Sequence, residues 1–428
     1  MSRSPFLQKI LTCGVNIVRV FVAATFIFSG VVKLIDPHGT EYKISDYASV
    51  FHMKAFLPGI LPLTLAVLLA AFEFVLGVRL LVGIKRRQTL AFILLMMAVL
   101  TPLTGYLYAT DVLVDCGCFG DALSLSNGQT FAKNLMLVVC ALFLLCFFRR
   151  MTKLVTFHTQ WLVGLYSWVF AFCFAAYNLY ALPIIDFRPF HLGVDLLKEL
   201  QQNEEAEYET VFILEKDGRQ ETFTLDDYPD STWTFVDSRT RILHGDEPTN
   251  GVQDFCMVDV ESGEDISLPF LSEPGYKFLL IMPYVETADD GVMDQLMMLS
   301  DYCRNRDYPL YALTSSSDEA INHWCDLTGA EYTFCRSDAL MLKTMARSNP
   351  ALMLLRDGMI IGKWSSSRLP SEEQLRQGLD DATWAHQEPL EGMWRFVRIA
   401  LWYLLPMIVL IVVSAFVAQR SKVPREEV

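Results

Sequence analysis

Residues 57–83 read LPGILPLTLAVLLAAFEFVLGVRLLVG, an apolar run long enough to cross a lipid bilayer as a helix. Comparable runs recur along the chain, so we expect a protein embedded in the lipid bilayer by several helices. The sequence predicts five more spans, each about 20 residues long, at residues 12–35, 89–109, 129–148, 160–182 and 397–418.

The composition indicates two unlike parts. The chain has 428 residues, is 52% hydrophobic and carries a formal charge of −14. It is too apolar for one soluble domain and too charged for a membrane bundle alone. Acidic residues concentrate between about Asp195 and Glu391, which predicts a solvated domain there. The pI of about 5.0 argues against a nucleic-acid partner.

The basic residues predict the orientation of the spans. They cluster before the first span and after the second, fourth and sixth spans, at residues 3–9, 85–87, 149–153 and 420–425. If six spans alternate, these clusters share one side, which the positive-inside rule makes cytoplasmic, together with both termini. The outward-facing segments would be 36–56, 110–128 and 183–396. In a bacterium, this means an inner-membrane protein with a periplasmic domain.

We therefore predict a membrane α-helical bundle that carries an extracytoplasmic α/β domain. A four-helix module is followed by a fifth helix, a mainly-β linker region, the α/β domain, and a sixth helix with a cytoplasmic tail. The predicted boundaries are, in that order, 1–155, 156–184, 185–254, 255–390 and 391–428.

Local patterns support this reading of the outer segment. HLGVDLLKELQQ (191–202) is helix-like, and YETVFILEKDG and RQETFTL read as two strands around a Lys-Asp-Gly turn. From residue 277 the pattern alternates between strand and helix. It ends with ALMLLRDGMIIGKW (351–364), two strands around an Asp-Gly hairpin turn.

The stretch most suggestive of chemistry is VDCGCFGDALSLSNGQTFAKN, residues 114–134, between the third and fourth spans. Gly117 allows a tight turn that would bring the sulfurs of Cys116 and Cys118 together, and Gly120 frees the next turn. A disulfide across so few residues is strained and therefore easy to reduce. The favoured interpretation is a pair active in thiol–disulfide exchange.

Two other interpretations of Cys-Gly-Cys remain open. The pair is a static disulfide or inert turn in one, and a copper or zinc site in the other, with His38 and His52 as further ligands. The acidic neighbours Asp115 and Asp121 disfavour a permanently reactive thiolate, which fits a resting disulfide better.

Charged residues inside the spans are costly in lipid and are expected to find partners. For Glu73 in the second span, the favoured partner is Arg19 in the first, although Glu73 could instead be protonated or deliver protons to a bound quinone. Lys33 and Asp36 mark the outer end of the first span. If the first four helices bundle, Lys33 is close enough to Cys116 and Cys118 to stabilise a thiolate; otherwise it is an interfacial anchor.

These residues resemble the DoxX/MauE membrane family over about residues 10–150. The resemblance rests on three features: Arg19 with FSGVVKLIDP (28–37), Glu73 with Gly77 after it in the second span, and DCGCFGD (115–121). It implies a four-helix membrane module with a redox role. MauE-type members are associated with disulfide formation in a secreted partner, and DoxX-type members with quinone-linked sulfur oxidation.

Residues 255–385 resemble a thioredoxin-like fold. KFLLIMPY (277–284) stands where the first central strand of that family would be, and Pro350 matches its usually cis proline. The segment that would carry Cys-x-x-Cys is VETADDG (285–291), which has no cysteine, so we expect no dithiol exchange there. Cys325 and Cys335 could bridge, but are expected to be structural or free.

The leading hypothesis is a membrane thiol–disulfide oxidoreductase in which Cys116 and Cys118 exchange with a periplasmic thiol protein and electrons pass to or from a quinone. The supporting residues would be Glu73, Arg19, Lys33, Asp36 and Asp115, and no metal ligands are assigned. The rival hypothesis is a non-enzymatic scaffold whose thioredoxin-like domain binds a protein or envelope component. A small-molecule carrier is a third possibility, although no inverted repeat supports it.

Overall fold

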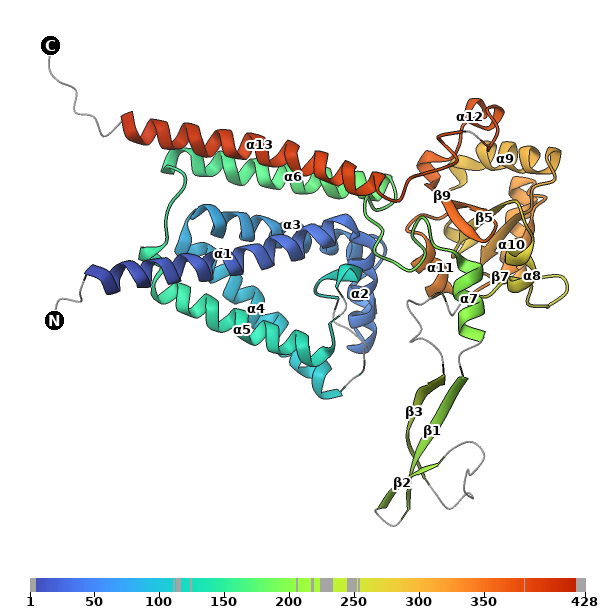
Figure 1. Ribbon diagram of the computed structural model, residues 1–428, viewed down its shortest axis with the longest axis horizontal. Helices are drawn as coiled ribbons and strands as arrows, with labels where there is room; N and C mark the ends of the chain where they lie inside the picture. Colours follow the sequence, from blue (N-terminus) through green and yellow to red (C-terminus); the bar gives the residue numbers. More distant parts are fainter. Residues whose placement is uncertain are drawn as a thin grey trace. The chain divides into compact units, whose positions relative to one another are not determined.

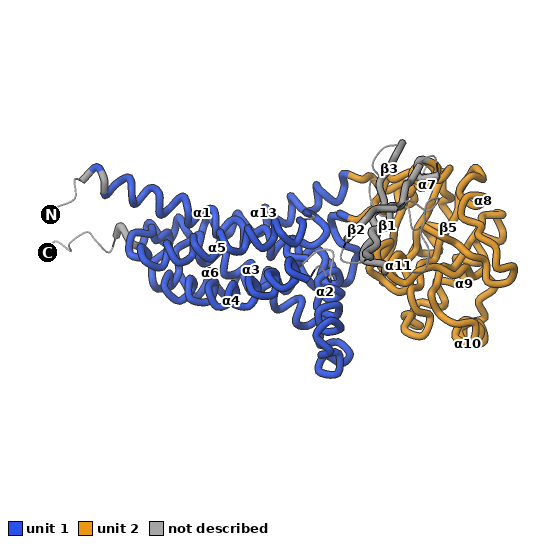
Figure 2. The backbone as a smooth tube through the Cα atoms, turned by 90° about the horizontal axis from the view of Figure 1, so that it is seen from below, with its two compact units in different colours: residues 1–187, 390–428 blue, residues 188–389 orange. Residues whose placement is uncertain are grey.

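The computed structural model describes residues 5–110, 112, 117–123, 125–204, 207–216, 219–223, 234–244, 252, 255–380 and 382–420 (Figure 1). The chain divides into two compact units, coloured separately in Figure 2. We call residues 1–187 with 390–428 the membrane unit, and residues 188–389 the α/β unit.

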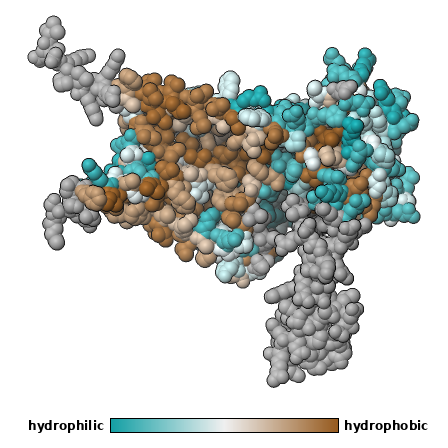
Figure 3. Space-filling view, viewed as in Figure 1, coloured by the Kyte–Doolittle hydropathy of each residue, from teal (hydrophilic) through white to brown (hydrophobic). Residues whose placement is uncertain are grey.

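Six helices of the described chain are long and apolar enough to cross a membrane, as predicted. They are α1 (Pro5–Ile35), α3 (Leu61–Val82), α4 (Arg86–Thr110), α5 (Asn127–Cys146), α6 (Gln160–Tyr180) and α13 (Glu391–Arg420). Figure 3 shows apolar side chains gathered over the membrane unit, whereas hydrophilic ones dominate the α/β unit. Helices suit lipid because they satisfy their backbone hydrogen bonds internally.

Helices α1 and α3 pack very closely and run antiparallel. A Cβ atom on Gly30 would lie 2.5 Å from the backbone nitrogen of Phe74, and one on Gly77 would lie 2.7 Å from that of Ile27. Small residues let helix backbones approach each other in membranes, where van der Waals packing drives association. The two glycines therefore fix how α1 faces α3.

A helix not predicted from the sequence, α2 (Pro37–Val50), follows α1 and crosses its direction (Figures 1 and 2). Asp36 is its N-cap and accepts a hydrogen bond from the nitrogen of Gly39 at 2.9 Å. Pro37 suits the first turn because that position needs no N–H donor. The short 3-10 helix Lys54–Phe56 leads from α2 toward α3.

The α/β unit begins with α7 (Leu196–Glu204) and a three-stranded antiparallel sheet in the order β2-β1-β3. Its strands are β1 (Glu207–Lys216), β2 (Arg219–Phe223) and β3 (Thr234–His244). The first two match the predicted pair, while β3 was not predicted. The turn between them, residues 217–218, lies outside the described residues.

A second sheet of six strands forms the core of the α/β unit, in the order β4-β7-β6-β5-β8-β9. Strands β5, β6 and β7 are parallel, whereas β8 and β9 are antiparallel. The strands are β4 (Val258–Asp259), β5 (Tyr276–Met282), β6 (Leu310–Thr314), β7 (Thr333–Arg336), β8 (Ala351–Arg356) and β9 (Met359–Ser365). The helices are α8 (Ser267–Ser272), α9 (Met293–Asn305), α10 (Asp318–Thr328), α11 (Ala339–Met345) and α12 (Glu372–Arg376).

The central strand β5 is buried along its whole length, because one hydrophobic core packs on each face of the sheet. The predicted hairpin turn joins β8 to β9, where Asp357 and Gly358 have φ angles of 52° and 84°. These positive angles are typical of a tight Asp-Gly turn. The peptide bond before Pro350, which leads into β8, is cis as expected.

Substituting Gly77 with alanine should destabilise the membrane unit. The new methyl group would lie 2.7 Å from Cγ1 of Ile27, and such overpacking typically costs about 1–3 kcal/mol. Gly164→Ala in α6 is the matched control, since nothing lies within 4 Å of its Cβ position. Thermal midpoints in detergent should fall for Gly77→Ala alone; equal midpoints for both variants would contradict the close packing.

Candidate functional site

A buried ion pair joins α1 to α3. The Nζ atom of Lys33 lies 2.6 Å from Oε1 of Glu73, and the two side chains are only 7% and 2% exposed. A single charge in the middle of a membrane helix costs about 2.5–3.5 kcal/mol on insertion scales. Pairing removes the net charge, so both residues are tolerated here.

The predicted pairing of Glu73 with Arg19 is wrong. Arg19 instead donates from Nη1 to the backbone oxygen of Thr152 at 2.6 Å. The antiparallel packing of α1 and α3 places Glu73 opposite the end of α1 that carries Lys33. Arg19 lies about 21 Å farther along the same helix, because each residue adds about 1.5 Å.

Ser29 connects this ion pair to Cys118. Its Oγ atom lies 2.6 Å from Oε2 of Glu73 and 2.9 Å from the carbonyl oxygen of Cys118. It also accepts a hydrogen bond from Nζ of Lys33 at 3.2 Å. Sequence reasoning missed Ser29. The signal was its position one helical turn before Lys33, which places both on the same face of α1.

The turn at Cys118 has a left-handed backbone on both sides. Gly117 and Gly120 have φ angles of 62° and 52°, a region that side-chain-bearing residues rarely adopt. A Cβ on Gly117 would also lie 2.8 Å from Cγ of Lys43. Cys116 and Asp115, the other predicted residues of this turn, lie outside the described residues.

A small cavity of about 30 Å³ lies beside the ion pair. Its walls include Glu73, Cys118, Phe119 and Lys133, and Nζ of Lys133 lies 4.1 Å from the centre of the Phe119 ring. The volume can hold a water molecule or two, but it is smaller than a quinone ring.

The remaining predicted polar residues of this region have local roles. Asp36 caps α2, and Nδ1 of His38 lies 2.8 Å from Oε2 of Glu41. Within the described ranges, no group of three or more His, Cys, Asp or Glu side chains could hold a metal ion.

In the α/β unit, segment 285–291 is held by hydrogen bonds. Ser316 Oγ donates to Oε2 of Glu286 at 2.5 Å and accepts from the nitrogen of Val285 at 3.0 Å. Asn349 Nδ2 donates to the backbone oxygen of Tyr284 at 2.7 Å. The segment is thus fixed between the end of β6 and the loop before β8, with no thiol on it.

The thiols of the α/β unit are poorly suited to exchange. Burial raises the pKa of Cys303 and of Cys335 to about 12, so both stay protonated near neutral pH. Cys325 and Cys335, which the sequence left open as a bridge, are both free and pack against different cores on opposite faces of the sheet.

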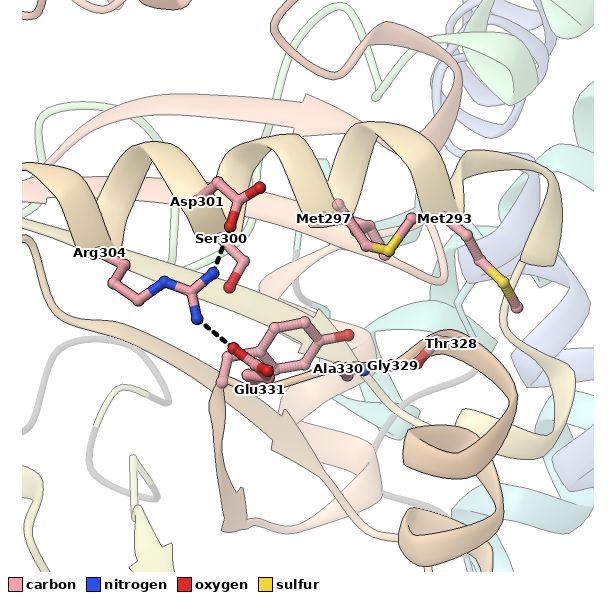
Figure 4. A pocket seen from close by; sticks show the side chains of 11 residues that line it. Met293, Met297, Ser300, Asp301, Arg304, Thr328, Gly329, Ala330 and Glu331 are labelled. Carbon is pink, nitrogen blue, oxygen red and sulfur yellow. Dashed lines mark hydrogen bonds and ion pairs between the residues drawn. The ribbon is translucent and has the colours of Figure 1, made fainter.

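A separate cavity of about 210 Å³ lies in the α/β unit between α9 and the turn after α10. Figure 4 shows Met293 and Met297 along one wall and Arg304 between the carboxylates of Asp301 and Glu331. These hydrogen bonds raise the pKa of Arg304. Its charge is already compensated, so the cavity is a weak candidate for an anionic ligand.

Two segments match known families. Residues 11–147 match the family model for methylamine utilisation protein MauE, which confirms that part of the predicted resemblance. Residues 208–244, which include most of the β2-β1-β3 sheet, match a domain of unknown function (DUF8463). No curated protein and no solved structure gives a significant match.

Breaking the ion pair should cost far more than removing it. Lys33→Met or Glu73→Gln alone leaves one buried charge without its partner, which typically costs about 3–5 kcal/mol. The double variant leaves no net charge and should regain much of that loss. Thermal midpoints in detergent of the unchanged protein, the two single variants and the double variant give the coupling energy between the two side chains. If the losses of the single variants add up in the double variant, the two side chains do not interact.

Stability should fall at alkaline pH because of the buried thiols. The pKa of Cys303 rises from 9.0 to about 12 on folding, so between these values only the unfolded chain loses its proton. Each such thiol lowers the free energy of unfolding by up to about 1.4 kcal/mol per pH unit in that window. Comparing thermal midpoints at pH 8 and 10.5, we expect a smaller drop for Cys303→Ala than for the unchanged protein; an identical drop would contradict this assignment.

Proposed function

We propose that this multi-pass membrane protein, whose residues 11–147 are of the MauE family, is a thiol–disulfide oxidoreductase that acts through Cys116 and Cys118. The observation that carries the proposal is the position of Ser29, whose Oγ lies 2.6 Å from Oε2 of the buried Glu73 carboxylate and 2.9 Å from the carbonyl oxygen of Cys118. Ionisable residues inside membrane spans commonly mark functional sites. Here such a residue is linked directly to the cysteine turn.

The proposed orientation puts the cysteine turn and the α/β unit on the extracytoplasmic side. With six spans both termini share one side, and the basic clusters favour the cytoplasm for that side. The α/β unit lies between the fifth and sixth spans in the sequence, and the turn between the third and fourth. Both would then face the periplasm of a bacterium, an oxidising compartment that supports disulfides.

The proposed reaction oxidises a partner protein. The Cys116–Cys118 disulfide is cleaved, a disulfide forms in the partner dithiol, and two electrons and two protons move onto Cys116 and Cys118. Reoxidation re-forms the Cys116–Cys118 bond and passes the same two electrons and two protons to a quinone, which becomes a quinol.

For the α/β unit, we propose a thioredoxin-like role in partner binding without its own dithiol chemistry. The arrangement of parallel β5 and β6 followed by the antiparallel β8–β9 hairpin supports the resemblance. Segment 285–291 offers no cysteine, and the thiols of Cys303 and Cys335 are buried. The unit would therefore recruit the substrate protein rather than oxidise it.

The absence of cysteine from segment 285–291 favours a second candidate function, a non-enzymatic scaffold. A cysteine-free segment at the position of a thioredoxin active site suits a domain that only binds. In that case the helices serve as an anchor, and Cys116 and Cys118 form a static turn.

A trapping experiment distinguishes the two functions. Membranes are treated with a thiol-blocking reagent, and Cys118→Ala, Cys116→Ala and the double alanine variant are compared on non-reducing gels. Oxidoreductase chemistry predicts mixed disulfides in the single variants, because the resolving thiol is missing, and none in the double variant.

Three results together would refute the redox function. No variant would form an adduct, the Cys116–Cys118 pair would resist reduction in the glutathione range, and the double variant would retain full function. Heavy-maleimide tagging of the reduced pair reports its resting state in the same membranes.

A further inference from the structure

We propose that residues 51–60, between α2 and α3, are a membrane-surface anchor that inserts apolar side chains into the lipid leaflet at the cysteine-turn end of the helix bundle. We call this segment the apolar tip; its sequence is FHMKAFLPGI. The anchor goes beyond both functions considered above, and it holds whichever of them is correct.

The apolar tip leaves large apolar side chains uncovered. Phe56 and Ile60 are 72% and 74% exposed, and Phe51 and Met53 are exposed as well. The tip lies between two spans and is too short to cross a bilayer itself. Exposed apolar patches mark contacts with a membrane or with another protein. The choice between these two partners follows from where the tip lies.

Helix α2 carries the tip sideways from the helix bundle. In Figures 1 and 2, α2 lies across the direction of α1 and α3. Membrane-spanning helices run roughly along the bilayer normal, with an average tilt of about 20°. Helix α2 therefore lies near the plane of the membrane surface. A segment at its end is displaced along that surface rather than away from it.

A contact between two rings sets the depth of the tip. Phe51 packs against Tyr106 of α4, with the ring centres 5.6 Å apart. Tyr106 precedes the end of α4 at Thr110 by four residues, which is about 6 Å along the helix. Phe51 thus lies at the level of the last turn of a span, where aromatic side chains gather at the interface between lipid and water.

The tip is continuous with the lipid-facing surface of α3. Leu61, Leu65 and Leu68 are exposed, and their spacing places them on one face of that helix. Lipid covers this face of a membrane span. Because Ile60 directly precedes Leu61, the same lipid reaches the tip.

The charges around the tip suit phospholipid headgroups. The sequence has no acidic residue between Asp46 and Glu73, although the whole chain carries a net charge of −14. Lys54 is exposed within the tip. A lysine at a membrane surface keeps its apolar stem in lipid and extends its ammonium group to the phosphates. Acyl chains would therefore contact the apolar side chains, and headgroup phosphates would contact Lys54.

An anchored tip would also hold α2 beside the cysteine turn. Helix α2 packs on this turn, since a Cβ atom on Gly117 would lie 2.8 Å from Cγ of Lys43. Lipid contact at the end of α2 would keep the helix at the membrane surface, and thereby keep Lys43 against the turn.

The test places a genetically encoded fluorescent amino acid at position 56 of the full-length protein in phospholipid vesicles. The probe is excited at wavelengths that the 8 tryptophans do not absorb. Three quenchers are compared: lipids brominated near the headgroup, lipids brominated near the end of the acyl chain, and iodide on both sides of the vesicle. Matched controls carry the probe at Leu327 of α10 and at Trp402 of α13, which are 64% and 79% exposed.

We expect the probe at position 56 to be quenched most by bromine near the headgroup and little by iodide. The probe at position 402 should be quenched most by bromine near the chain end. Position 402 lies about 16 Å along α13 from Glu391, which is roughly half of the hydrocarbon thickness. The probe at position 327 should be quenched by iodide alone.

A second pair of variants tests what holds the tip in lipid. With the probe at position 56, Met53→Asp should cause a loss of lipid quenching and a gain of iodide quenching, because a carboxylate resists transfer into lipid. Met53→Leu keeps the side chain apolar and should leave both kinds of quenching unchanged.

Three results would overturn the proposal. Iodide quenching at position 56 equal to that at position 327, without lipid quenching, would place the tip in water. Shielding from both iodide and lipid would mean that another protein or a second copy of this chain covers the tip. Lipid quenching that Met53→Asp leaves unchanged would mean that the apolar side chains do not hold the tip there.

Discussion

The ion pair between Lys33 and Glu73 is the constraint on which the membrane unit depends. Two charges buried this completely are stabilised by their contact, so α1 and α3 keep the register that brings them together. Gly30 and Gly77 permit that register by letting the backbones approach. Close packing, charge neutralisation and the position of Ser29 are thus consequences of one arrangement of two helices.

The cysteines of the two units lie in different surroundings. The α/β unit contains thiols, but Cys303 and Cys335 are buried and strongly disfavour ionisation. Segment 285–291, where a thioredoxin-like domain would carry its reactive pair, is fixed by hydrogen bonds to neighbouring loops. The cysteine that contacts a buried charge network is Cys118, in the membrane unit. In the proposed function, the membrane unit would carry out the chemistry and the α/β unit would bind the partner.

Hydropathy predicted the six spans, and the Asp-Gly turn predicted the β8–β9 hairpin, because both depend on local sequence. The partner of Glu73 could not be predicted in this way. Arg19 and Lys33 lie on the same helix, and only the register between α1 and α3 selects one of them. Asp36 followed by Pro37, an N-cap residue before a proline at the first helical position, could have predicted the start of α2. The four-residue strand β7, by contrast, owes its form to neighbours distant in sequence.

The pairing also changes how the protein can influence its cysteines. Lys33 was a candidate for stabilising a thiolate by its charge, but its Nζ lies 2.6 Å from a carboxylate, and the pair as a whole is neutral. A neutral pair projects only a weak field, so charge is a poor means of tuning Cys118 from this side. In the proposed Cys116–Cys118 disulfide, geometry would be the stronger means, because the stability of a disulfide depends on how far its turn departs from relaxed angles. The Ser29 hydroxyl, whose oxygen lies 2.9 Å from the Cys118 carbonyl oxygen, would act on that geometry directly.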